Sequence, residues 1–447
     1  GTSSGFSTGN FRLKTLKTPD FSIAFRVDAS SEIGTGHLMR CLTLAVNLRE
    51  SGAHTHFVCR HISEQLHSFL LEQGHEVSLL SKQDNSESNS NLLHADWLGV
   101  NQQFDARETI ETISGRKWDW LVVDHYGLDH RWETELRQVA DKIFVIDDLA
   151  DRKHDCDALL DQNLYADMNR RYTGKVPEFC KLLLGPSHAL LRNEFISSRE
   201  GVSPVRIDVK RILIFFGGVD LDNYTSMAIA ALASLNLQGY GVDVVIGNSH
   251  PQKNNILEQC RINHFNCHVQ TKKMAELMSA ADLAIGAGGS ATWERCCLGL
   301  PTISWGVAAN QQQLVEDAAL AGLIYSLDTQ KLSINYLARH LQALLENYRL
   351  RQMLSVRGMS EVDGRGTLRV CRVLGVASFN VRVVTGQDSK SLYEWRNDPV
   401  IRNVSRENSI IPLEDHQKWF LSVMSDPDRI LIVVERDDSA VGVVRFD

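Results

Sequence analysis

The residue best suited to acid–base chemistry is a histidine that follows two glycines in the run GTGHLMR, residues 34–40. Gly34 and Gly36 permit a tight turn beside a ligand, and a helix that begins there favours a neutral imidazole or a bound anion. Because an imidazole ordinarily titrates near neutrality, His37 suits a general base for water or a hydroxyl group. The alternative is structural, with His37 as a helix cap and Arg40 in a surface ion pair. The run lacks the third glycine of a dinucleotide-binding fingerprint.

A second polar run, DHYG at residues 124–127, follows an apolar segment that reads as a strand. Side chains at the carboxyl end of a parallel strand are placed to meet a ligand, and Tyr126 can hydrogen-bond to a sugar or stack on it. The alternative is a turn formed by Asp124 and Gly127.

A glycine-rich turn, GAGGSATWE at residues 286–294, lies between an apolar strand and a helix. Gly288 and Gly289 let backbone N–H groups approach a phosphate, and Ser290 can donate its hydroxyl. Glu294, one turn into the helix, can accept two ribose hydroxyl protons. Together these parts predict a nucleotide-diphosphate site.

Two further loops are expected to converge on the same rim. Gly217 and Gly218 follow one strand, and Asn310 and Gln311 follow another and open a helix.

Three acidic residues, Asp147, Asp148 and Asp151, lie beyond another predicted strand. They have no His or Cys at metal-ligand spacing, so they are interpreted as turn and cap residues and no metal is expected.

The elements that must position these residues are short apolar runs that alternate with helix-period segments from Phe21 onward, which is typical of parallel sheets built from βαβ units. The expected strands are 22–27, 55–59, 76–80, 118–123, 142–146, 211–216, 243–246, 267–269, 283–286 and 302–305. Helices are expected at 36–51 and 131–140, and a surface loop at 81–91. The pattern restarts after the polar stretch 197–208, which predicts two doubly wound α/β domains, 21–200 and 201–376, with a ligand crevice between facing strand ends.

The rest of the chain has a different rhythm. From residue 379 we expect strands at 381–384, 430–435 and 440–446 and helices at 389–397 and 413–425, an α+β region. Residues 1–20 are rich in Ser, Thr and Gly and are interpreted as a flexible leader.

Composition excludes several classes of protein. The chain has 447 residues, and 47 Lys and Arg against 55 Asp and Glu give a net charge of −8, which argues against a dedicated nucleic-acid binder. No apolar run is long enough for a membrane helix. Nine cysteines without a CxxC pair do not form a secreted disulfide framework, so a reducing cytoplasm is expected.

Taken together, the segments 26–45 and 122–129, the 286–294 turn and the pair Asn310-Gln311 resemble the PseG-type UDP-2,4-diacetamido-2,4,6-trideoxy-β-L-altropyranose hydrolases of pseudaminic acid biosynthesis. The resemblance runs from about residue 21 to residue 374, with the motifs in the family's order. It implies two Rossmann-like domains in a glycosyltransferase-B fold that catalyse hydrolysis of a nucleotide sugar without a metal or other cofactor.

Carried over by position, the resemblance makes His37 the base for water and places Tyr126 and Asn310 on the sugar side. The segment KMAELM at 273–278, which contains Met274, resembles the part of this fold that reads uracil through backbone groups. The substrate-binding candidates are Asp28, Gly34, Gly36, Arg40, Gly217, Gly218, Met274, Gly288, Gly289, Ser290, Glu294 and Gln311.

Residues 382–447 resemble, independently, the start of a GNAT-type N-acetyltransferase, in the motifs WRND at 395–398, HQKWF at 416–420 and VGVVRFD at 441–447. In that fold a later loop grips the pyrophosphate of acetyl-CoA. Residues 379–447 are therefore expected to be a partial, inactive acetyltransferase domain, and acetyl-CoA would serve only a complete one.

The favoured hypothesis is an inverting UDP-sugar hydrolase in which His37 activates water and a small-molecule UDP-sugar is the partner. A glycosyltransferase of the same fold and a non-catalytic nucleotide-sugar-binding module are the alternatives. An oligomeric state is not predicted.

Overall fold

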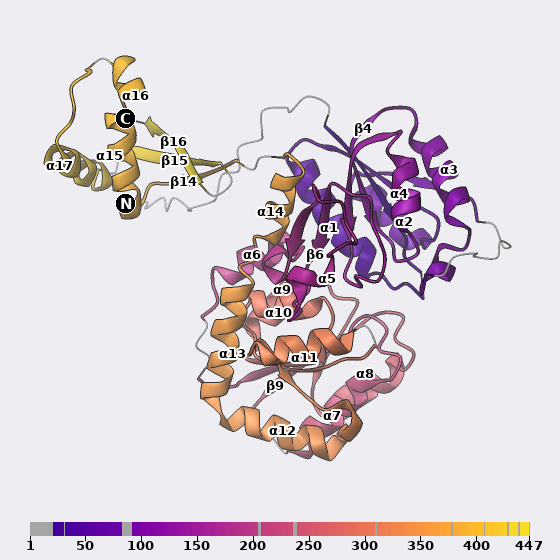
Figure 1. Ribbon diagram of the computed structural model, residues 1–447. Coiled ribbons are helices and arrows are strands. Elements are labelled where there is room, and N and C mark those ends of the chain that lie inside the picture. The colour runs from indigo at the N-terminus through magenta and orange to yellow at the C-terminus, as the bar shows by residue number, and fades with distance from the viewer. Residues whose placement is uncertain are drawn as a thin grey trace. The chain divides into compact units, whose positions relative to one another are not determined.

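The computed structural model describes most of the chain from residue 21 onward (Figure 1). The described ranges are 21–30, 32–82, 92–203, 207–235, 239–308, 311–376, 379–405, 407–426, 429–436 and 439–446. The predicted leader, most of the predicted 81–91 loop and the candidate Asn310 lie outside them. The chain divides into two compact units, residues 21–49 with 54–370, and residues 50–53 with 371 onward.

The first unit contains two parallel sheets. In the first half of this unit the strand order is β3-β2-β1-β4-β5-β6-β7. The strands are β1 (Ser22–Val27), β2 (His54–Cys59), β3 (Glu76–Leu79), β4 (Trp118–Asp124), β5 (Ala140–Ile146), β6 (Ala158–Asp161) and β7 (Lys181–Leu184). The helices are α1 (Gly36–Glu50), α2 (Glu64–Glu72), η1 (Ala95–Leu98), α3 (Gln102–Ile113), α4 (His130–Leu136), α5 (Met168–Arg171), η2 (Pro186–His188) and α6 (Asn193–Arg199).

In the second half of the same unit the strand order is β10-β9-β8-β11-β12-β13, again parallel. The strands are β8 (Arg211–Phe215), β9 (Gly241–Ile246), β10 (Asn266–Val269), β11 (Leu283–Ala287), β12 (Thr302–Trp305) and β13 (Tyr325–Ser326). The helices are α7 (Tyr224–Ser234), α8 (Lys253–Ile262), α9 (Met274–Ala280), α10 (Ala291–Cys297), α11 (Gln312–Leu320), η4 (Thr329–Lys331), α12 (Ile334–Glu346), α13 (Tyr348–Glu361) and α14 (Gly366–Val373).

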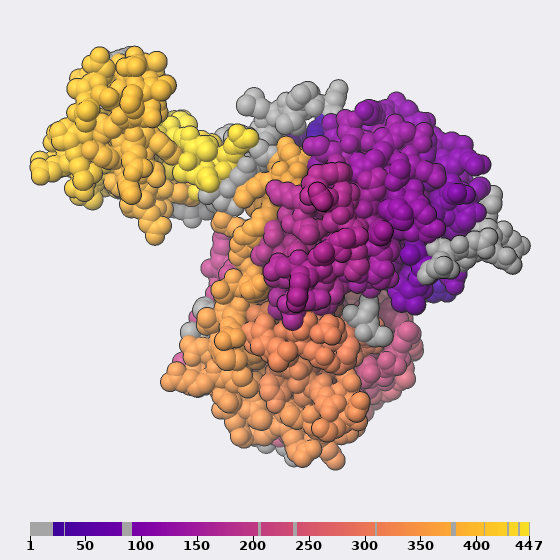
Figure 2. Space-filling model, viewed as in Figure 1, coloured from indigo at the N-terminus to yellow at the C-terminus, as the bar shows by residue number. Residues whose placement is uncertain are grey.

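Both sheets are buried on two faces, because helices cover each side. All of β1 is buried, and in β8 the side chains of Ile212 and Ile214 join one apolar core while Leu213 joins the other. This is why the strands read in the sequence as continuous apolar runs. The two halves pack directly against each other, as the space-filling view shows (Figure 2).

The sequence-based strands of this unit are confirmed within two residues at each end. Three short strands, β6, β7 and β13, were not predicted. The helix expected at 131–140 is shorter than predicted. It ends at Leu136, because Ala140 already opens β5.

The order of the strands decides where a ligand can bind. In each sheet the chain reverses direction across the sheet at one point, between β1 and β4 in the first half and between β8 and β11 in the second. Crevices open beyond the carboxyl ends of strands at such switch points. The His37 loop follows β1, the DHYG run closes β4 and the glycine-rich turn follows β11, so all three motifs lie at switch points.

The second unit contains a three-stranded antiparallel sheet in the order β14-β15-β16. Its elements are β14 (Phe379–Val383), η5 (Gly386–Asp388), α15 (Ser389–Asn397), α16 (Pro399–Asn403), α17 (Leu413–Met424), β15 (Ile430–Arg436) and β16 (Ser439–Phe446). Leu392, Phe420 and Val433 belong to the small core between the helices and the sheet. The predicted strands and helices of this region are confirmed, whereas its kinship to acetyltransferases stays a prediction. In the described part of the chain, no helix has both the length and the apolar character to cross a membrane.

Candidate active site

His37 lies in the first turn of α1, where a left-handed Gly34 (φ +78°) lets the chain turn from the β1 loop into the helix. Its Nδ1 atom is 2.6 Å from Oδ1 of Asp124, the last residue of β4. Arg40 Nη2 also lies 3.2 Å from Nδ1, but the carboxylate is the nearer partner and can only accept, which favours the proton on Nδ1 and leaves Nε2 as the ring nitrogen that accepts a proton. The side chain is 11% exposed and lines a cavity. This is the arrangement a general base requires.

Arg40 fixes the carboxylate of Asp124, which in turn contacts His37. Its Nε donates to Oδ2 of Asp124 at 2.6 Å and its Nη2 to Oδ1 at 2.7 Å. Burial alone would raise the pKa of Asp124, but the charge of Arg40 and the hydrogen bonds from Arg40 and His37 overcome it and keep that pKa well below its usual range. The surface ion pair considered for Arg40 is therefore wrong: the pair is buried, and it serves the His37–Asp124 contact.

Tyr126 packs its ring edge-on to the His37 ring, with centroids 4.6 Å apart, and its hydroxyl donates to Oδ1 of Asp148. Burial, together with Asp148, raises the pKa of this phenol well above its ordinary value. Tyr126 therefore stays protonated and positions its neighbours. Asp148 also accepts from Arg40 Nη1 at 3.2 Å and from Asn163 Nδ2 at 3.2 Å. The interpretation of Asp148 as a mere turn or cap residue is wrong.

The two halves of the first unit share one cavity of about 170 Å³. We call its first-half side the base lip and its second-half side the glycine lip. The base lip comprises Ile33, Gly36, His37, Arg40, Asp148, Leu149, Gln162, Asn163 and Tyr165, and the glycine lip comprises Gly288, Gly289, Ser290, Gln311 and Leu314. Drug-sized ligands fill roughly 300–1,000 Å³, so this space fits only part of a nucleotide sugar.

The glycine lip offers backbone donors. In the part of the chain that the structure describes, the N–H groups of Gly289 and Ser290 have no protein acceptor. Gly288 must be glycine, because a Cβ there would collide with the side chain of Val315 on α11. Gln311 Oε1 accepts from the Val307 N–H at 3.2 Å and fixes the neighbouring loop. The lip thus presents free donors on a tightly packed loop, as an anion requires.

Among the residues of the base lip that were missed from the sequence, Gln162, Asn163 and Tyr165 carry polar side chains. These residues follow β6. Polar side chains directly after a strand also identified the DHYG run, but here the strand itself was not predicted. Asn163 contacts both halves of the unit. Its Nδ2 donates to Asp148, and its Oδ1 accepts from Trp293 Nε1 at 3.0 Å.

Other predicted binding residues lie outside the cavity lining. Asp28 is fully buried, and its Oδ1 accepts from the N–H groups of Arg60 and His61, so it holds a loop and does not face a ligand. Met274 belongs to the core of the second half. Gly217 adopts a left-handed conformation (φ +93°) and, with Gly218, forms the loop after β8.

Glu294 is directed toward Arg192, whose Nη2 lies 3.4 Å from its Oε1. Its pKa is raised by burial, with Arg192 opposing that shift. A contact between Glu294 and a ribose stays a prediction.

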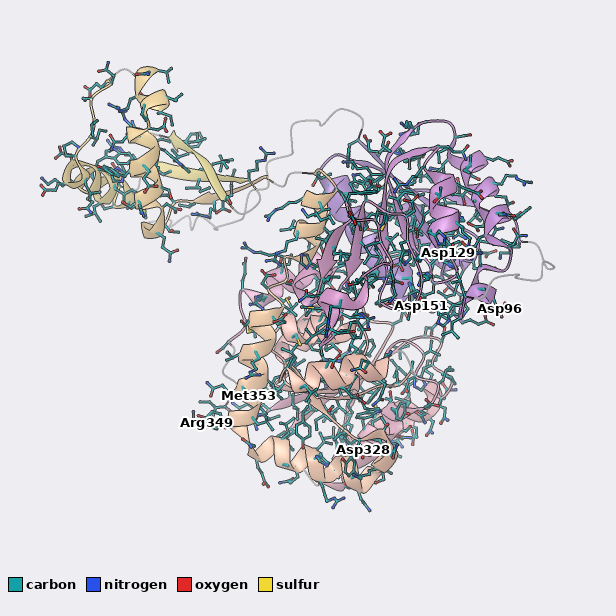
Figure 3. All side chains as sticks on the ribbon, in the orientation of Figure 1. Asp96, Asp129, Asp151, Asp328, Arg349 and Met353 are labelled. Atoms are coloured by element: carbon teal, nitrogen blue, oxygen red, sulfur yellow. The ribbon has the colours of Figure 1, made fainter. Side chains whose placement is uncertain are left out.

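Asp147 acts as the turn residue that was expected, whereas Asp151 forms an ion pair with the next residue. Asp147 accepts from the Ala150 N–H at 2.9 Å, and Asp151, labelled in Figure 3, pairs with Arg152 at 2.9 Å. Among the described residues, no three His, Cys, Asp or Glu side chains are grouped as metal ligands.

No family model matches the chain. It is 24% identical over 435 residues to an uncharacterized protein of Methanocaldococcus jannaschii, covering 93% of this chain and 81% of that one. It is 26% identical over 270 residues to the UDP-2,4-diacetamido-2,4,6-trideoxy-beta-L-altropyranose hydrolase of Campylobacter jejuni, with 60% and 85% covered. A third relative is the spore coat polysaccharide biosynthesis protein SpsG of Bacillus subtilis, 24% identical, with 78% and 96% covered.

Solved structures of glycosyltransferases share the fold. A UDP-glucosyltransferase of Polygonum tinctorium superimposes with a TM-score of 0.57 and 14% identity, over 80% of this chain and 99% of that one. MurG of Acinetobacter baumannii gives a TM-score of 0.54, with the same identity and coverage. The first unit therefore has two Rossmann-like domains arranged as in the glycosyltransferase-B fold.

Proposed function

We propose that this protein hydrolyses a UDP-sugar by attack of water at the anomeric carbon with inversion, releasing UDP. The proposal rests above all on the buried His37–Asp124 pair, which leaves Nε2 as the free ring acceptor in a cavity shared with a glycine-rich loop. The relative from Campylobacter jejuni, whose name states such a hydrolase, supports the choice of reaction. We propose its substrate, UDP-2,4-diacetamido-2,4,6-trideoxy-β-L-altropyranose of pseudaminic acid biosynthesis, for this chain as well.

In the proposed reaction the base lip handles the proton. Nε2 of His37 takes a proton from water as the oxygen attacks the anomeric carbon, and Asp124 stabilises the imidazolium that forms through the 2.6 Å contact with Nδ1. Arg40 keeps Asp124 ionised and fixed throughout. The carboxylate therefore orients the base and does not itself take the proton.

The glycine lip handles the leaving group. The bond from the anomeric carbon to the diphosphate oxygen breaks through an oxocarbenium-like transition state, and negative charge develops on UDP. The free N–H groups of Gly289 and Ser290 are proposed to stabilise that charge. UDP is a good leaving group, so no general acid is required. Among the other candidates, Tyr126 and Asn310 are proposed to act on the sugar side, and Met274, Glu294 and Gln311 on the nucleotide side.

The test uses the full chain and two substrates, the proposed altropyranose derivative and UDP-N-acetylglucosamine as a comparison sugar. We expect release of UDP from the first in buffer alone, at a rate that EDTA does not change. Release that occurs only after addition of a sugar or lipid acceptor would instead identify a glycosyltransferase. Binding of the UDP-sugar without turnover under both conditions would identify a binding module.

A further inference from the structure

Arg295, on α10, lies directly behind the glycine lip. It is 2% exposed, its Nη2 donates to the carbonyl of Ala287 at 2.6 Å, and a Cβ on Gly286 would lie 2.8 Å from its Nη1. The guanidinium therefore lies against the backbone of the turn whose front surface forms the cavity wall. Nε of Arg295 is buried without a hydrogen-bond partner among the described residues.

Among the described residues, no carboxylate oxygen lies within 4.0 Å of the Arg295 guanidinium, and Glu294 attracts it only from beyond that distance. The neighbouring Glu294 pairs with Arg192 instead. Burial lowers the pKa of Arg295 to about 10, which is the direction expected for a cation without an adequate counter-charge.

The buried arginines of the first half are built differently. Arg26 pairs with Asp105 at 2.7 Å, Arg60 with the same carboxylate at 2.9 Å, and Arg152 with Asp147 at 2.8 Å. A buried charge is ordinarily retained only when it is paired, because desolvation is expensive. The protein therefore carries one strongly buried cation beside the cavity whose counter-ion the described residues do not supply.

We infer that Arg295 is the buried positive charge that makes the glycine lip prefer a nucleoside diphosphate to an uncharged nucleoside. It acts through the loop rather than by touching the ligand, as a positioning and electrostatic residue. Its hydrogen bond to the Ala287 carbonyl occupies an acceptor in the turn that an anion must approach. Its positive charge also attracts the anion through the intervening backbone of the turn, where the low dielectric strengthens the interaction. This inference rests on the proposed function, since it assumes that the anion held there is the diphosphate of UDP.

The experiment compares the affinities of UDP and uridine, measured by calorimetry on the full chain. Loss of a charge weakens binding of the anion alone, whereas loss of structure weakens both ligands together. For Arg295→Met we expect UDP to bind about tenfold more weakly while uridine changes less than about twofold. For Arg295→Lys, which keeps a cation and is less disruptive, the UDP preference should stay within about threefold of wild type.

Arg351→Met is the matched control. Arg351 is also 2% exposed, donates to the carbonyls of Leu344 and Ile207 and has no ion pair among the described residues, but it lies on α13 and does not line the cavity. Its replacement should leave the ratio of UDP to uridine affinity unchanged. A ratio that is also unchanged in Arg295→Met, or lost to the same degree in Arg351→Met, would overturn the inference. A wild-type chain that binds neither ligand would overturn the proposed function itself.

Discussion

The base lip and the glycine lip are built on the same kind of switch point but balance their charges in opposite ways. In the base lip Arg40 pairs with the carboxylates of Asp124 and Asp148, and Asp124 in turn holds Nδ1 of His37. Behind the glycine lip, the described residues give the buried Arg295 only neutral oxygen acceptors, and they leave the N–H groups of Gly289 and Ser290 without an acceptor. A side of the cavity whose arginine is paired with carboxylates suits proton transfer. A side with a buried arginine that has no ion pair suits the binding of an anion. In the proposed mechanism, one cavity therefore combines proton transfer on one side with anion binding on the other.

The largest effect should come from the base lip. His37→Ala is expected to lower kcat by about 10²–10⁴-fold, the usual range for loss of a general base, while UDP affinity stays near that of wild type. Steady-state kinetics and calorimetry on the same preparation separate the two. A variant with near-normal kcat would return His37 to the role of a helix cap.

Removing one charge from the buried ion pairs of the first half should lower the stability of the protein. Arg26→Met leaves Asp28 and Asp105 buried with fewer partners, which typically destabilises by about 3–5 kcal/mol. Urea unfolding measures the loss. As a control, Arg261→Met removes only an exposed helix pair with Glu258 and should leave the midpoint where it is. Equal midpoints for the two variants would mean that the buried network contributes nothing.

On the glycine-lip side, Glu294→Ala should weaken UDP binding by about 1.5–3 kcal/mol if the carboxylate meets ribose hydroxyls. The competing explanation is that Glu294 matters only through its ion pair with Arg192. Arg192→Met tests this explanation, because it removes the ion pair and keeps the carboxylate of Glu294. We expect the arginine variant to bind UDP at least as well as wild type. Unchanged UDP affinity in a folded Glu294→Ala variant would remove Glu294 from the nucleotide site.

An effect that appears only on changing the pH should come from Asp161, the last residue of β6. Burial, with Asp148 adding to it, raises the pKa of Asp161 to about 7, above its usual 3.8. The folded protein thus binds a proton more tightly than the unfolded chain, so this contribution to stability is full below pH 4 and is lost as pH rises through 7.

Urea titrations of wild type and Asp161→Asn across that window test the sign. Relative to the variant, the wild-type protein should lose about 2–3 kcal/mol of stability between pH 4.5 and pH 7.5. A difference between the two proteins that does not change with pH would contradict the shift.

The sequence predicted the parts of the molecule whose signals are local. Most strands of the two sheets, His37 at a glycine turn and the glycine-rich turn after β11 could be identified, because apolar periodicity and glycine spacing are written in adjacent residues. The side chains that pair with His37 and Arg40 could not be identified from the sequence. Asp124 lies 87 positions from His37, and Asp148 is 108 positions from Arg40, so their roles depend on which strands become neighbours in the sheet.

Asp28 and Arg295 show the same limit from opposite sides. Asp28 lies in the segment 26–45 and was predicted to bind substrate, but it is fully buried. Arg295 follows the predicted site residue Glu294 and was given no role from the sequence. Whether a buried charge finds a partner is a property of packing, which no spacing rule reports.

The central claim is that the base lip delivers water to the sugar while the glycine lip keeps the diphosphate. The most direct test is a single-turnover reaction of the full chain with the proposed UDP-sugar in ¹⁸O-labelled water, read by mass spectrometry of both products. Attack at the anomeric carbon predicts one ¹⁸O atom in the released sugar, analysed before exchange with solvent, and none in UDP. Label in UDP would mean attack at phosphorus, and would contradict the division of labour between the two lips.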